Sequence, residues 1–148
     1  MMDLTLRDGA IAPTYDQIRT LEAEIAKLPP AELVETHHFA HGVYGRELFI
    51  PAGTVLTGKI HRDSTLNVLM QGCIRVTSED GTVKEMEAPA VFVSPPGCKK
   101  VGFAITDTIW LNVHPTKLTD LAAIEAKFIV PEEPLLEHGG SEQCLGQQ

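Results

Sequence analysis

The first residues that could do chemistry are Lys59 and His61, followed by Thr65 and Asn67 and, further along the chain, by Lys100. Residues two apart in a strand point to the same side, so Lys59 and His61 share one face. Thr65 and Asn67 share one face of the next strand for the same reason. A protonated lysine has three donors and no lone pair, so it does not bind a metal. Lysines beside a histidine instead favour an anion, such as a phosphate, a carboxylate or a nucleotide.

Lys59 and His61 also have simpler interpretations. Lys59 can lay its aliphatic stem along the strand and place its ammonium in solvent. His61 can be a structural histidine held by hydrogen bonds. His61 can also be a general base, and Asp63, two residues further on, is then a candidate orienting partner.

His114 ends the run TIWLNVH and shares a strand face with Trp110 and Asn112. If that face points inward, His61 and His114 can supply two ligands of a weak metal site. Two histidines are fewer than the three protein ligands usual at a catalytic zinc. We therefore expect no bound metal and no other cofactor. Trp110 either stacks on a ligand or packs in the core.

Tyr44 and Arg46 are two residues apart in an earlier strand-like run, GVYGRELFI, so their side chains point to the same side of that strand. Arg46 can clamp a ligand through two parallel hydrogen bonds, or it can pair with an acidic neighbour such as Glu47 or Glu85. Both residues are candidates for ligand binding.

Two other groups of reactive side chains have a structural interpretation beside a functional one. His37, His38 and His41 lie in ETHHFAHG, for which we expect a loop that carries solvated or interface histidines rather than a metal site. Cys98 lies beside Lys99, which would favour a thiolate nucleophile. A small residue in a turn or in the core is the simpler interpretation of Cys98.

The composition is that of one globular domain. The chain has 148 residues, 43% of them hydrophobic, and a net charge of −8, which disfavours binding to a nucleic-acid duplex. No apolar run approaches the roughly 20 residues of a membrane helix, and MMDLTLRDGA does not have the pattern of a secretory signal. Three well-separated cysteines favour reduced thiols, so we expect a cytoplasmic protein without membrane partners.

The pattern of apolar residues predicts the elements that position these side chains. Residues 14–28 and 119–128 have helical periodicity, and Thr14 and Gln17 have the spacing of a capping box. Between the two helices, short β-rich runs alternate with turn sequences, among them Glu79-Asp80-Gly81, which predicts a hairpin. We divide the chain into an N-terminal helical segment (1–35), a barrel (36–116), a C-terminal helix (117–130) and a mobile acidic tail (131–148).

The spacing of Gly53, Lys59, His61, Thr65 and Gly72 resembles the first motif of the cupin (RmlC-like) family. The run Pro95-Pro96-Gly97, with Lys100 three positions later, resembles the second motif. The resemblance covers residues 40–115 and implies an all-β fold: a single antiparallel cupin β-barrel, or jelly roll, with the lysines and His61 turned into the barrel. Only His61 of the four usual metal ligands is present. The stretch YGRELFIPAGTVLTGKIHR also resembles small cupin-like proteins of tailed phages and prophages.

The predicted function is capture of a small anionic metabolite or nucleotide by a cupin without the usual metal site, as in a phage-encoded protein that sequesters a ligand. A metal-independent isomerase, epimerase or lyase with His61 as general base is the first alternative. A structural or assembly component is the second. Under all three hypotheses, the resemblance implies a homo-oligomer, a dimer or larger.

Overall fold

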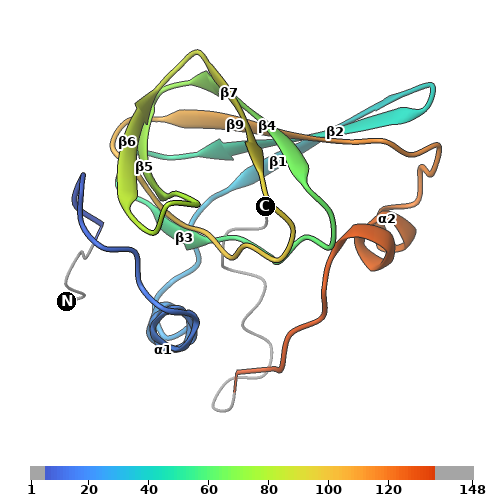
Figure 1. The fold of residues 1–148 in the computed structure, drawn as a ribbon. Coiled ribbons are helices and arrows are strands. Elements are labelled where there is room, and N and C mark those ends of the chain that lie inside the picture. Colours follow the sequence, from blue (N-terminus) through green and yellow to red (C-terminus); the bar gives the residue numbers. More distant parts are fainter. Residues whose placement is uncertain (1–5, 136–148) are drawn as a thin grey trace.

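The protein is built from antiparallel strands with one helix before them and one after them (Figure 1). The structure, a computed structural model, describes residues 6–135. The elements in chain order are α1 (Tyr15–Ile25), β1 (Val34–Ala40), β2 (Val43–Ile50), β3 (Val55–Thr57), β4 (Thr65–Gln71), β5 (Cys73–Thr77), β6 (Val83–Glu87), β7 (Ala90–Ser94), β8 (Val101–Ala104), β9 (Thr108–His114) and α2 (Leu121–Phe128). The predicted all-β class with two flanking helices is confirmed.

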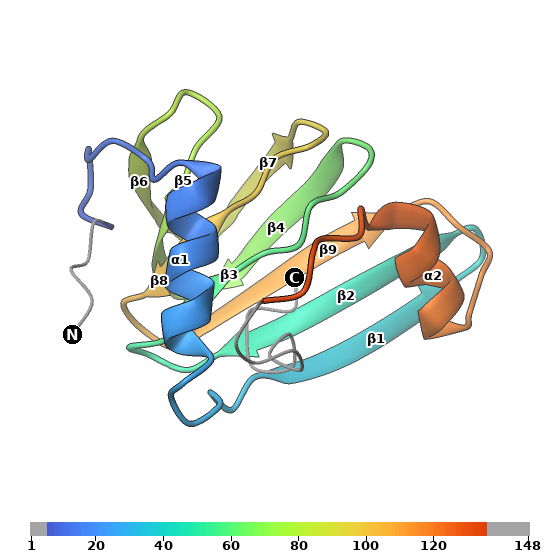
Figure 2. The same cartoon turned by 90° about the horizontal axis from the view of Figure 1, so that it is seen from below.

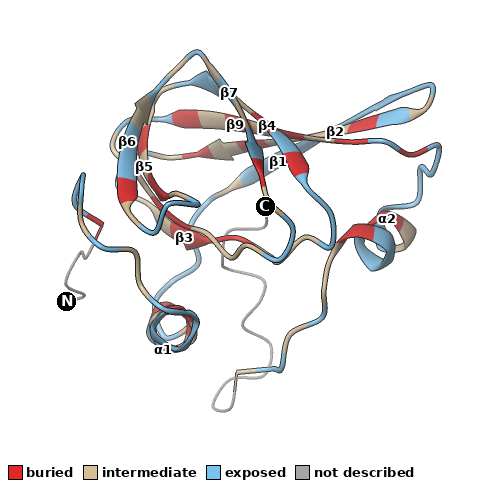
Figure 3. Cartoon of the chain, in the orientation of Figure 1, coloured by how far each residue is buried: buried red, intermediate tan, exposed pale blue. Residues whose placement is uncertain are grey.

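The strands form two sheets with a shared core between them. One sheet has five strands in the order β1-β2-β9-β4-β7, and the other has four in the order β3-β8-β5-β6. Side chains alternate between the two faces of each strand, and the inward ones fill the core, which is coloured as buried in Figure 3. The core contains Leu48 and Trp110 from the larger sheet, and Leu56, Ile74 and Ala104 from the smaller.

Tight turns after β4 and β5 fix the strand register. Gly72 has φ +93°, and a Cβ there would lie 2.3 Å from the carbonyl oxygen of Asp107, so only glycine fits. β5 and β6 form the predicted hairpin, with Thr77 opposite Val83. The Asp80 carboxylate accepts a 3.0 Å hydrogen bond from the backbone N–H of Thr82 across the turn.

The two helices cover different parts of the barrel (Figure 2). α1 begins with the predicted capping box between Thr14 and Gln17, and it buries Ile18 with Val101 of the four-stranded sheet. α2 has Asp120 as its N-cap, because the Asp120 side chain accepts a hydrogen bond from the N–H of Ala123. Ile124 and Phe128 of α2 pack on Tyr44 of β2. α2 therefore lies against the inner side of the five-stranded sheet.

Several boundaries differ from the predicted ones. His37 and His38 lie in strand β1 rather than in a loop, because β1 pairs with β2 in full register from Val34 onward. The sheet thus begins inside the segment assigned to the N-terminal helix. Glu132, at the start of the predicted tail, forms ion pairs with Lys99 of the barrel and Arg19 of α1. Residues 136–148, with Cys144, lie outside the described residues. No helix in residues 6–135 is long and apolar enough to cross a membrane.

Candidate functional site

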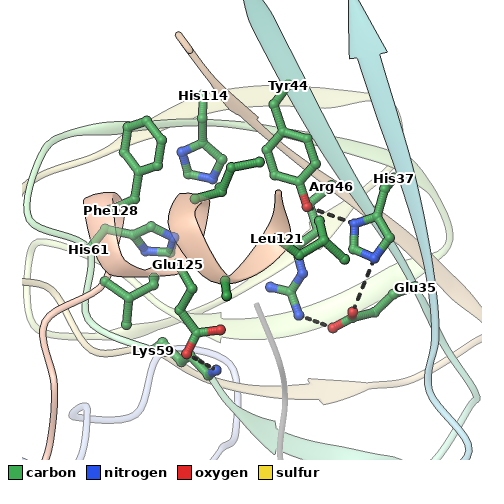
Figure 4. Close-up of a pocket in the computed structure, with 13 residues that line it drawn as sticks. Glu35, His37, Tyr44, Arg46, Lys59, His61, His114, Leu121, Glu125 and Phe128 are labelled. Atoms are coloured by element: carbon green, nitrogen blue, oxygen red, sulfur yellow. Dashed lines mark hydrogen bonds and ion pairs between the residues drawn. The ribbon is translucent and has the colours of Figure 1, made fainter. Parts of the chain in front are cut away.

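A pocket of about 260 Å³ lies between the inner face of the five-stranded sheet and α2 (Figure 4). Its walls come from β1, β2 and β9, from the segment between β3 and β4, and from α2. The lining residues are Glu35, His37, Tyr44, Arg46, Lys59, His61, His114, Leu121, Ala122, Ile124, Glu125, Phe128 and Ile129. Five of the predicted site residues are among them: Tyr44, Arg46, Lys59, His61 and His114.

The two cations of this pocket are each paired with a carboxylate. Arg46 donates from Nη2 to Glu35, its neighbour on β1. Lys59 Nζ lies 2.9 Å from Glu125 Oε2 on α2. The side chains of Arg46 and Lys59 are 15% and 24% exposed, and that of Glu125 is 57% exposed. Glu125 is therefore the partner that can move into water most easily.

His61 and His114 face each other across the inner end of the pocket. Their ring centroids lie 5.4 Å apart with an angle of 20° between the planes. Burial is the main reason that the pKa of each is lowered to about 4, and the positive charge of Arg46 adds to both shifts. Neither ring hydrogen-bonds to another side chain of residues 6–135. Both imidazoles are therefore neutral at pH 7, with ring nitrogens available to a ligand.

Tyr44 connects this end of the pocket to β1. The Tyr44 hydroxyl lies 2.7 Å from His37 Nδ1, and His37 Nε2 lies 3.5 Å from Glu35 Oε1. If the His37 proton lies on Nε2, facing Glu35, then Nδ1 accepts the hydrogen bond that the phenol donates. Burial raises the pKa of Tyr44, so its phenol is protonated at neutral pH.

A second and much smaller cavity, of about 10 Å³, lies deeper in the barrel. Its lining includes Lys59, His61, Thr65 and Lys100. This volume holds at most about one water molecule. Lys100 lines this small cavity and not the larger pocket, and its Nζ lies 3.5 Å from Cys98 Sγ. The structure thus brings Lys59 and Lys100 near the same point but leaves no room for an organic ligand between them.

Asn67 and Trp110 belong to a buried hydrogen-bond network. Asn67 Oδ1 accepts from Asn112 Nδ2 at 2.6 Å and from Trp110 Nε1 at 3.3 Å. Asn67 Nδ2 donates to Ser94 Oγ at 2.8 Å. Trp110 is 1% exposed and packs in the core, in line with the simpler of its two interpretations. Neither Asn67 nor Trp110 lines the larger pocket.

Solved structures with similar folds are numerous. An RmlC-like cupin from Shewanella frigidimarina aligns with 62% of this chain and 82% of its own, at 19% identity and a TM-score of 0.51. The chain has the cupin fold. Ectoine synthase from P. lautus (13% identity, TM-score 0.53) covers 72% of this chain and 80% of its own. KdgF from Halomonas sp. (14% identity, TM-score 0.50) covers 60% of this chain and 83% of its own.

No family model matches the sequence, and no curated protein matches it either. The cupin fold is therefore established by the arrangement of the strands rather than by sequence relatives.

The side chains at the positions that the resemblance to the cupin motifs assigns to metal ligands do not form a coordination set. Lys59, Thr65 and Lys100 stand at three of the four positions, and a lysine ammonium has no lone pair to offer. The cavity at that point has a volume of only about 10 Å³. His61 and His114 are close together, but residues 6–135 contain no group of three His, Cys, Asp or Glu side chains placed to hold a metal. The donor set does not fit a metal.

Glu35, His37 and Glu125 line the pocket but were not among the predicted site residues. Glu35 and His37 lie in β1, which was expected to be a loop. Once β1 is paired with β2, the alternation of side chains places them on the same face of the sheet as Tyr44 and Arg46. Glu125 is contributed by α2, whose position over the pocket no local pattern encodes. The predicted alternative for Arg46, an acidic partner, is realised by Glu35 rather than by Glu47 or Glu85.

Proposed function

We propose that the protein binds a small organic anion in the pocket under α2, with Arg46 as its main contact. Arg46 carries this proposal because its side chain is only 15% exposed and lines the pocket. Within residues 6–135 it makes one side-chain hydrogen bond, through Nη2 to Glu35. A guanidinium has five N–H donors, so most of them remain for a carboxylate or phosphate.

Lys59 is the second proposed contact. Its ion pair with Glu125 is largely solvent-exposed on the Glu125 side, and such pairs contribute only about 0–1 kcal/mol. The oxygens of an anionic ligand can therefore replace the Glu125 carboxylate at Lys59, while Glu125 turns into water. Lys100 is not a contact in this proposal, because it does not line this pocket.

The size of the pocket favours a small metabolite over an intact nucleotide. Its volume of about 260 Å³ lies just below the roughly 300–1,000 Å³ of typical pockets for drug-sized ligands. Leu121, Ile124 and Phe128 of α2 supply an apolar wall for a short carbon skeleton. A carboxylate or phosphate on such a skeleton matches both the charges and the apolar wall.

A metal-independent enzyme is the second candidate function, and the neutral pair His61 and His114 favours it. Both rings line the same pocket as Arg46, and a neutral imidazole can take a proton from a bound substrate. His61 would be the general base of an isomerase, an epimerase or a lyase. Exchange of a ligand's C–H protons for deuterium, followed by NMR, would separate this candidate from plain capture.

The resemblance to cupin-like proteins of phages and prophages supports a narrower form of the proposal. In that form, the protein captures a metabolite in the cytoplasm of a phage-infected host. The chemistry of the pocket is the same in either setting.

A thermal-shift screen with small carboxylates and phosphates tests the proposal. An anion at a hundred times its Kd adds ~2.7 kcal/mol to stability. That gain raises the Tm by roughly 5–10 °C in a chain of this size. Arg46→Met should abolish the rise and Lys59→Met should reduce it. Lys100→Met is the matched control and should respond like the wild type.

The proposal fails if no anion raises the Tm of the wild type. It also fails if a folded Arg46→Met protein responds as strongly as the wild type does.

A further inference from the structure

The five-stranded sheet has a second face, which points away from the pocket. Tyr44, Arg46 and His114 point inward, and the residues that alternate with them point outward. The outward side chains of β4 and β7 are apolar and exposed. Leu66 is 40% exposed, Met70 48%, Val91 66% and Val93 58%.

These residues form one continuous surface, which we call the outer sheet face. Leu66 lies opposite Val93 in the pairing of β4 with β7, and opposite Val113 in the pairing of β4 with β9. Towards β2, the apolar surface continues into a shallow hollow lined by Val43, Gly45, Met70 and Leu111. Both helices lie on the inner side of this sheet, so no element of residues 6–135 covers the outer sheet face (Figure 2).

The outer sheet face also differs from the rest of the molecule in charge. The chain has a net charge of −8. Only one acidic side chain, Glu47, lines the hollow, and it is paired with His38 at 2.9 Å. Two copies that approach through this face therefore bring together neutral apolar surfaces, while their acidic surfaces stay apart.

We propose that the outer sheet face is the interface of a symmetric dimer of this chain. In a two-fold dimer the same surface of each copy meets its counterpart, so this apolar face would pack on an apolar face. Two such faces pack about 10 Å apart, in the same way as the sheets of a sandwich. Each outer sheet face would then become buried against its copy.

The area of the face is sufficient for a dimer. Five strands at ~4.8 Å spacing and about seven residues at ~3.3 Å each make a face of roughly 550 Å². Two copies bury about 1,100 Å², which clears the ~1,000 Å² expected of a biological interface.

Another segment of the same chain is a poor occupant of this face. Residues 136–148, LEHGGSEQCLGQQ, contain two leucines and are otherwise mostly polar. Such a segment has too little apolar surface to cover five strands. A second copy of the chain supplies an apolar surface of matching size and shape.

Sedimentation equilibrium of the full chain tests the proposal. The wild type should have twice the chain mass of 16.1 kDa. Val91→Glu combined with Val93→Glu should weaken the dimer at least a hundredfold and give a monomer. Both side chains are exposed in a single chain, so this variant should fold. Leu28→Glu places one glutamate at a leucine that is 54% exposed and lies outside the face, and it should remain dimeric.

Circular dichroism and the Tm show whether each variant is folded. Met70→Glu serves as a second disrupting variant if the double one does not fold. A wild type that stays monomeric at all concentrations would overturn the proposal, and so would a folded disrupting variant that stays dimeric. Wild-type binding to zwitterionic lipid vesicles with loss of the dimer would also overturn it. The anion-induced rise in Tm should persist in the folded variants, so this result is independent of the pocket.

Discussion

His61 and His114 lie as a stacked pair of rings whose centroids are 5.4 Å apart, in a protein that places Arg46 and Lys59 in the same pocket. Phe128 of α2 also packs on His114, with 4.6 Å between the ring centroids. Two protonated imidazoles at this distance would repel each other and the two cations. The pair is therefore stable only when neutral, which makes the pocket sensitive to pH.

The first prediction concerns stability between pH 4 and 6.5. The pKa of each ring is about 4 in the folded protein, against an ordinary value of about 6.5 when the chain is unfolded. Between these values the unfolded chain binds more protons, so the free energy of unfolding rises with pH across this window and is lost as the pH falls. The slope reaches about 1.4 kcal/mol per pH unit for each histidine.

Urea unfolding at pH 4.5, 5.5 and 6.5 measures this slope. His61→Asn and His114→Asn should each flatten it. His38→Asn is the control, since the His38 side chain is 55% exposed and lies outside the pocket. Equal slopes in the wild type and in His114→Asn would show that these rings do not control the pH dependence.

The fold was predictable because its main features are local. The capping box at Thr14, the hairpin turn at Asp80-Gly81 and the alternation along β4 and β9 each require only a few neighbouring residues. Gly53 and Gly72 keep positive φ in the turns where the cupin spacing places them. These local signals agree with one another, and together they define the barrel.

The site was only partly predictable, because its shape depends on packing between distant segments. The alternation of side chains along a strand predicted that Lys59 and His61 share one face. The position of α2, however, decides that Lys59 pairs with Glu125 and that the open pocket lies beside Arg46. Lys100 has the expected place in the second cupin motif. The cavity there is nearly filled, and no sequence pattern reports a cavity volume.

The second prediction concerns a buried ion cluster between α1 and the barrel. Lys99 Nζ lies 2.9 Å from both Glu22 and Glu132, and it donates to the carbonyl of Gly58 at 2.9 Å. The Lys99 and Glu22 side chains are 4% and 5% exposed. Lys99→Met leaves a buried carboxylate without this partner, which typically costs about 3–5 kcal/mol.

The free energy of unfolding in urea tests this cost. Lys84→Met is the matched control, because Lys84 pairs with Asp80 on the surface and should contribute less than about 1 kcal/mol. A loss below 1 kcal/mol for Lys99→Met would mean that Arg19, 2.7 Å from Glu22, and the Thr57 hydroxyl, 2.5 Å from it, stabilise this carboxylate without Lys99.

The third prediction concerns the C-terminal segment. Glu132 is the only residue after position 130 that pairs with Lys99 within residues 6–135, and its carboxylate also accepts from Tyr15 at 3.0 Å. A chain ending at residue 135 keeps both contacts and is the reference for the comparison. A chain ending at Val130 should still fold but with a lower Tm, because Lys99 loses one of its two carboxylates. Equal Tm values for the two truncated chains would contradict this role of Glu132.

The last prediction concerns competition for Lys59. Glu125 Oε2 lies 2.9 Å from Lys59 Nζ, so an anion that binds Lys59 must displace the Glu125 carboxylate. Glu125→Gln removes the competing charge and should tighten anion binding by about two- to fivefold, since an exposed pair contributes ~0.5–1 kcal/mol. Titration calorimetry with an anion identified by thermal shift measures the change. Glu24→Gln is the control, because Glu24 is equally exposed, pairs with Lys27 on α1, and changes the net charge by the same amount. Equal tightening in both variants would assign the effect to net charge, and no tightening in Glu125→Gln would mean that the ligand does not reach Lys59.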